Sequence, residues 1–96
     1  MVESAPDRSA VRGALTFGTA RGAVAAGLRA FSGARGPIQL DLSGVNVSDS
    51  AGLAVLIEWL GWGRRGGREL RFSNLPQALA AIARICDIEE LLPRRR

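Results

Sequence analysis

One segment of the chain, Leu40 to Trp62, constrains the fold more than any other stretch. It starts with the apolar alternation of a β-strand, crosses the polar turn Ser48-Asp49-Ser50, and continues as the most apolar run of the protein. A turn that opens a helix leaves backbone N–H groups without intrahelical partners beside the positive end of the helix dipole. Such a turn can hold an anion, carry a phosphate or contact a partner, but it is not by itself an active site.

The rest of the chain alternates between strand and helix patterns. The expected strands are Val11–Phe17, Ile38–Leu42 and Glu69–Ser73, and the expected helices begin at an N-cap Thr19, cover Ala51–Arg65, and begin near Pro76. Apolar residues at helical spacing define the inner faces of the first helix (Ala20, Val24, Leu28, Phe31) and of the last (Leu75, Leu79, Ile82, Cys86). Asp87–Leu92 is expected to form a short final turn. This order predicts an α/β domain in which crossover helices lie on a sheet.

The domain boundaries follow from the ends of the chain. Residues 1–10 are expected to be loose or to form a weak edge strand, residues 11–93 to form a single domain, and residues 94–96 to form a disordered basic tail. No apolar run reaches the roughly 18 residues of a membrane span. The N-terminus lacks the basic start and apolar core of a signal peptide, so we expect a cytoplasmic protein.

The composition removes several classes of function. The chain has no histidine and one cysteine, Cys86, which we expect to be a buried, inert thiol. The usual general base, the usual catalytic triad and most zinc sites are therefore absent. The net charge of +4 is spread over arginines, and the one internal cluster, Arg64 to Arg71, has no nucleic-acid-binding module around it. We expect no catalysis, no metal, no cofactor and no nucleic-acid partner.

The helix expected at Ala51–Arg65 is apolar on too many sides for a surface helix. At about 100° per residue, the face that should pack on the sheet carries Leu53, Leu56, Ile57 and Leu60. The opposite face carries Ala51, Ala54, Val55, Glu58 and Trp62, with a single charge. Either a second layer of this protein or a partner must cover that face, and the small size of the domain favours a partner. Trp59 is expected in the core and Trp62 as an interface anchor, and the same face could serve a homodimer.

Three segments together resemble the STAS domain family, the sulfate-transporter and anti-sigma-factor-antagonist modules. They are Leu40 to Gly44, the turn Asp49-Ser50-Ala51-Gly52-Leu53, and the strand Leu70-Arg71-Phe72 before a helix opened by proline. The similarity extends over roughly residues 11–93. Within the family, ALTF, DSAGLAVLIEWL and ELRFSNLPQAL are most similar to the small cytoplasmic STAS subunit of the Mla phospholipid-transport system.

The resemblance implies a small mixed β-sheet flanked by helices and a non-enzymatic role. Such a subunit binds the MlaF-like ATPase of an ABC transporter that maintains outer-membrane lipid asymmetry, and stabilises or regulates it. It would lie at the inner membrane through the transporter complex. The alternative within the family is an anti-sigma-factor antagonist that acts by partner switching. A third hypothesis, from the residues alone, is a sensor that holds an anion or lipid at the loop Ser48–Gly52.

Two positions separate these readings. Phospho-regulated antagonists carry the acceptor hydroxyl on the residue before the motif glycine, and this chain has Ala51 there, which cannot be phosphorylated. Ser50 matches the position where the transporter subunit keeps a hydroxyl for partner binding. From the residues alone, Ser50 is equally well a helix-capping residue, and Asp49 is a cap rather than a catalytic acid. Pro76 and the adjoining last helix could extend the partner surface.

Overall fold

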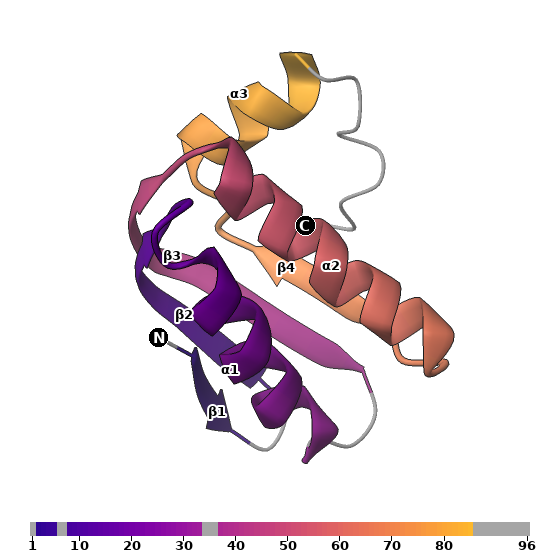
Figure 1. Cartoon of the computed structure of the whole chain (residues 1–96). Helices are drawn as coiled ribbons and strands as arrows, with labels where there is room; N and C mark the ends of the chain where they lie inside the picture. Colours follow the sequence, from indigo (N-terminus) through magenta and orange to yellow (C-terminus); the bar gives the residue numbers. More distant parts are fainter. Residues whose placement is uncertain (1, 6–7, 34–36, 86–96) are drawn as a thin grey trace.

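The computed structural model describes residues 2–5, 8–33 and 37–85 (Figure 1). Within these residues the elements are, in order, β1 (Val2–Ala5), β2 (Arg8–Leu15), α1 (Ala20–Ser32), β3 (Ile38–Ser48), α2 (Ser50–Arg65), β4 (Leu70–Ser73) and α3 (Gln77–Ile85). The alternation predicted from the sequence is confirmed, and β1 adds a strand within residues 1–10. The expectations for Cys86, for the turn 87–92 and for the tail 94–96 fall outside the described residues.

The strands form one mixed sheet in the order β1-β2-β3-β4. β1 is antiparallel to β2, whereas β2, β3 and β4 are mutually parallel. Each parallel connection moves the chain one strand further in the same direction, so right-handed crossovers place α1 and α2 on the same face of the sheet (Figure 1). α3 packs against α2. The predicted class, an α/β fold with a small mixed sheet, is confirmed.

Two strands differ from the sequence prediction. β2 begins at Arg8 rather than Val11 and ends at Leu15, before Phe17. β3 does not stop at Leu42 but continues to Ser48. Its second half pairs with β2 through two register shifts, so its side chains do not follow the regular apolar alternation that marks a buried strand.

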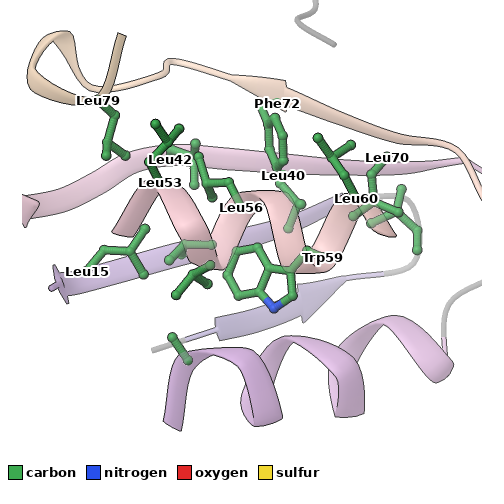
Figure 2. Close-up of a cluster of buried hydrophobic side chains, with 14 of the residues drawn as sticks. Leu15, Leu40, Leu42, Leu53, Leu56, Trp59, Leu60, Leu70, Phe72 and Leu79 are labelled. Atoms are coloured by element: carbon green, nitrogen blue, oxygen red, sulfur yellow. The ribbon is translucent and has the colours of Figure 1, made fainter. Parts of the chain in front are cut away.

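α2 packs on the sheet beside α1, and its buried side chains lie in the core between the helices and the sheet (Figure 2). The sheet-facing role predicted for Leu53, Leu56 and Leu60 is confirmed, because all three are buried. The prediction for Ile57 is wrong, since its side chain is 37% exposed, and Val55, expected on the outer face, is buried. The buried arc is rotated because α2 contacts α1 as well as the sheet, and both contacts need apolar surface.

The contact between α1 and α2 is built on Trp59. The indole is fully buried, as predicted, and its Nε1 donates a hydrogen bond to the carbonyl oxygen of Val24 at 3.4 Å. A Cβ at Gly27 would overlap the indole ring, so a glycine lets the helix backbone lie against it. Phe31 meets the indole edge-on, with 5.4 Å between ring centroids.

This packing also changes the inner face of α1. Its buried residues are Ala23, Gly27 and Phe31, whereas Val24 and Leu28, predicted to face inward, are half-buried. The prediction is confirmed for Phe31, whereas Val24 and Leu28 pack against the core only in part. The closest approach of the α1 backbone to the Trp59 indole is made at Gly27.

The last strand and helix follow the sequence more closely. In β4, Leu70 and Phe72 are buried and Arg71 is exposed, as the alternation predicts. In α3, Leu79 is buried as expected, and Pro76 directly precedes the first helical residue.

Candidate functional site

The candidate site is built around Asp49, which joins the end of β3 to the start of α2. The Asp49 backbone is extended, and its Oδ1 accepts hydrogen bonds from the N–H groups of Ala51 at 2.9 Å and Gly52 at 3.2 Å. This is a helix N-cap, so the capping role predicted for Asp49 is confirmed. Its other oxygen, Oδ2, accepts from the N–H of Phe17 at 3.2 Å. The Asp49 carboxylate therefore caps the N-terminus of α2 and links it to the turn after β2.

The contact between Gly52 and the end of β2 explains why this position of the motif is a glycine. A Cβ at this position would overlap the carbonyl oxygen of Leu15, at the end of β2. The first turn of α2 therefore lies directly against β2, and the Asp49 N–H donates to the same Leu15 carbonyl at 3.4 Å. This close packing fixes the position of the first residues of α2.

Ser50 and Ala51 are presented by this fixed turn. Ser50 is the first residue of α2 and is exposed, while Ala51 is half-buried. Ala51 is the residue before the motif glycine and carries no hydroxyl group. The Ser50 hydroxyl therefore stands at the surface, one residue before the position at which an antagonist would carry its phosphate.

Two exposed apolar residues next to this turn were missed by the sequence analysis. Phe17 is 85% exposed and Val47 is 57% exposed. Phe17 was placed in a strand, but the chain leaves β2 at Leu15 and turns. The Thr19 hydroxyl, expected to cap α1, ties that turn by donating to the carbonyl oxygen of Ala14 at 2.9 Å. The signal in the sequence was the Thr-Phe-Gly-Thr run after the strand, which is typical of a turn.

A groove of about 570 Å³ runs between α1 and α2, beginning beside this turn. α2 contributes four of the predicted partner-binding residues to it, and α1 contributes five further residues. The lining residues are Ala51, Ala54, Val55 and Glu58 from α2, and Ala20, Arg21, Val24, Ala25 and Leu28 from α1. The structure thus gathers half of the predicted site along one apolar groove. The α1 half was missed because Ala20, Val24 and Leu28 were assigned to the inner face of α1, and Arg21 and Ala25 were given no role.

The structure places the remaining predicted residues elsewhere. Trp62 lies twelve positions after Ser50 on α2, about 18 Å along the helix axis. It is half-buried, with its ring 5.7 Å from that of Phe31 and the guanidinium carbon of Arg68 6.0 Å from its centroid. Pro76 is half-buried before α3 and does not line the groove. The turn and the groove, rather than the whole outer face of α2, are therefore the candidate site.

A second carboxylate, that of Asp41, lies within β3. Its Oδ1 accepts from the Asn74 side-chain amide at 3.0 Å and from the Ser43 N–H at 2.9 Å. The bond from Asn74 is the main cause of a lowered pKa for Asp41, with smaller contributions from Ser43 and the charge of Arg8. These bonds join β3 to the β4–α3 turn, so Asp41 acts in the scaffold rather than in the site.

The described part of the chain offers little else for chemistry. Residues 2–5, 8–33 and 37–85 contain no group of three or more acidic, cysteine or histidine side chains placed to hold a metal ion. None of the helices in these ranges has the length and apolarity needed to cross a bilayer. What the site presents is a hydroxyl, exposed apolar side chains and a groove, which are the elements of a protein contact surface.

Comparison with known proteins agrees with this geometry. A family model described as "Mlab, STAS domain" matches residues 3–93. No curated protein sequence matches the chain closely enough to be counted as a relative.

Solved structures share the fold at low sequence identity. An anti-sigma factor antagonist from Thermotoga maritima has a TM-score of 0.74 and 14% identity, covering 98% of this chain and 83% of that one. A sulfate transporter family protein from Wolinella succinogenes has a TM-score of 0.69 and 21% identity, covering 96% and 75%. The anti-sigma factor antagonist SpoIIAA, in its unphosphorylated form, has a TM-score of 0.68 and 14% identity, covering 100% and 86%. At these identities the likeness establishes the fold alone.

Proposed function

The chain belongs to the STAS domain family, in the group that the MlaB model describes, and from this premise we propose that it is the STAS subunit of a phospholipid-transport ABC transporter. In this role it binds the MlaF-like ATPase subunit, and through it the permease, and stabilises or regulates the ATPase without catalysing a reaction. It is held at the cytoplasmic side of the inner membrane by the complex, and it serves outer-membrane lipid asymmetry.

The observation that carries the proposal is the Ser50-Ala51 pair at the start of α2. The Asp49 cap and the close approach of Gly52 hold the exposed Ser50 hydroxyl in a fixed place, and Ala51 offers no acceptor for a kinase. A surface that cannot be switched by phosphate at this position suits a constitutive subunit better than a partner-switching antagonist. Exposed Phe17, whose N–H donates to the Asp49 carboxylate, adds an aromatic side chain, a kind of residue enriched at interfaces.

The proposal is tested by tagging the protein in its own host and identifying what copurifies from solubilised membranes. We expect an ABC ATPase with its permease. Ser50→Asp should reduce that recovery because it places an unpaired charge in the contact, whereas Ser50→Thr keeps the hydroxyl and should retain it. Both variants should keep the wild-type melting temperature within a few degrees, because Ser50 is exposed. Recovery of the ATPase with Ser50→Asp at wild-type levels would remove Ser50 from the site.

An anti-sigma-factor antagonist is the second candidate, because SpoIIAA, one of the similar structures, is an antagonist. It requires a soluble anti-sigma kinase among the copurifying proteins and phosphate on a serine. Ala51 counts against it. Incubation with ATP and the recovered partner, followed by intact mass measurement, distinguishes the two: we expect no added phosphate.

A further inference from the structure

We propose that the groove between α1 and α2 receives an amphipathic helix of the partner, lying antiparallel to both helices. The inference rests on the proposed function, because the partner is the ATPase subunit. It extends that function by adding a face of α1 to the contact and by fixing the direction of the bound helix.

The shape and lining of the groove fit a helix. Its α1 wall extends from Ala20 to Leu28, eight residue steps or about 12 Å, which is the length of roughly two helical turns. Alanines on both walls, Ala25 and Ala54 among them, let a third backbone approach to the 8–10 Å typical of packed helices. Val24 and Leu28 lie half-buried at its base, so an apolar helix face would complete their burial.

The charges of the groove give the bound helix a direction. α1 and α2 both follow parallel strands, so both N-termini and Arg21 lie at one end of the groove. Glu58 lies two turns further along α2, toward the other end. An antiparallel helix puts its C-terminal carbonyl groups and any acidic residue of its last turn at Arg21. Its positive N-terminal end, or a basic residue of its first turn, then lies at Glu58.

The position of the groove connects it to the rest of the site. It begins at Ala20 and Ala51, beside the Asp49 cap that holds Ser50 and the Phe17 backbone. A partner that contacts Ser50 can therefore contact the groove as well, because the two lie next to each other on the same surface. A second copy of this chain is a weaker fit, because two identical grooves facing each other are both hollow and neither supplies a projecting helix to fill the other.

The groove is tested by one variant and a control on the same helix. Ala25 is exposed and lines the groove, so Ala25→Arg fills the space while leaving the core unchanged. Gly22 is exposed, does not line the groove, and has open space around it, so Gly22→Arg adds the same side chain and charge to α1. Binding is measured by biolayer interferometry against the detergent-solubilised ATPase–permease complex. We expect Ala25→Arg to weaken binding by tenfold or more and Gly22→Arg by less than about twofold.

The direction is tested with photo-cross-linking. p-Benzoylphenylalanine in place of Arg21 should cross-link to the C-terminal part of a helix of the ATPase, and in place of Glu58 to the N-terminal part of the same helix. Hydrogen exchange should show protection of the amides of residues 20–28 in the complex. Cross-links in the opposite order would overturn the antiparallel arrangement.

The remaining outcomes show whether the groove proposal alone, or the proposed function with it, is wrong. If the wild-type protein binds the ATPase and Ala25→Arg binds equally well, the groove proposal is wrong and the proposed function stands. If position 21 cross-links to a second copy of this chain, the groove is a dimer contact and the proposal is overturned. If the wild-type protein recovers no ATPase, both proposals fall together.

Discussion

Removing the Asp49 carboxylate should destabilise the protein through two separate contacts. Its Oδ1 accepts from the N–H groups of Ala51 and Gly52, and its Oδ2 accepts from the N–H of Phe17. Asp49→Ala leaves the first turn of α2 without its cap and releases the turn after β2. Both groups of donors then depend on water.

The magnitude follows from the two contacts. Replacing an N-cap aspartate by alanine costs typically about 1 kcal/mol, within a range of roughly 0.5–2 kcal/mol. An intramolecular hydrogen bond contributes about 1 kcal/mol net, and the bond to Phe17 is solvent-exposed, so it lies at the low end. We expect a total loss of about 1.5 kcal/mol in the free energy of unfolding. For a domain of this size, that lowers the melting temperature by about 6–12 °C.

Asp49→Asn separates the two contributions. Asparagine is about as good an N-cap as aspartate, and its Oδ1 can accept from Ala51 and Gly52 as the carboxylate does. Its amide nitrogen cannot accept from the Phe17 N–H, so this second contact is lost. The asparagine variant should therefore lose about a third as much stability as the alanine variant, or about 0.5 kcal/mol.

Urea unfolding, followed by tryptophan fluorescence, gives both free energies. Amide hydrogen exchange then assigns the losses. The Phe17 amide should lose protection in both variants, and the Ala51 and Gly52 amides in Asp49→Ala alone. Equal stability losses in the two variants, or an alanine variant as stable as the wild type, would refute the division of the carboxylate between helix and turn.

Three further predictions test the interface, the core and the pH dependence. Phe17→Ser should leave the free energy of unfolding within about 0.5 kcal/mol of wild type, because the side chain is 85% exposed, yet weaken ATPase binding by about tenfold. Unchanged affinity would remove Phe17 from the contact. Gly27→Ala should cost about 1–2 kcal/mol in urea unfolding, because overlap with the Trp59 indole outweighs the roughly 1 kcal/mol helix preference of alanine. A variant as stable as wild type would contradict this close packing. The lowered pKa of Asp41, held mainly by the Asn74 amide, means that the carboxylate stabilises the fold above its ordinary pKa of 3.8, and that this stability is lost as the pH falls through the lower pKa of the folded state. Asp41→Asn should therefore melt below the wild type at pH 7, and the difference should shrink in acid; a difference independent of pH would show that the charge of Asp41 contributes nothing.

Local signals predicted the part of the site that depends on neighbouring residues in the chain. The start of α2 and the role of Asp49 could be predicted because an N-cap is formed by residues within one turn of each other. The alternation of Leu70, Arg71 and Phe72 predicted β4 for the same reason. These features need no knowledge of what packs against them.

The parts that were missed depend on contacts between distant segments. β3 continues to Ser48 because its second half pairs with β2, and the register shifts in that pairing remove the apolar alternation. Val55 is buried and Ile57 is exposed because α1 covers one side of α2. A helical wheel alone does not show which side of the helix a neighbouring helix covers. Phe17 was missed as a surface residue because an apolar aromatic side chain beside a strand is more often buried.

The Asp49 carboxylate both stabilises the domain and orders its contact surface. The carboxylate fixes the backbone at Phe17 and at Ser50 before any partner arrives, so less conformational entropy is lost on binding. Asp49→Ala should therefore weaken ATPase binding in addition to lowering stability, whereas Ser50→Asp should weaken binding without lowering stability. If Asp49→Ala bound the ATPase as tightly as wild type at a temperature where it remains folded, the order of the turn would be irrelevant to recognition. The contact would then rest on the groove and on Ser50 itself.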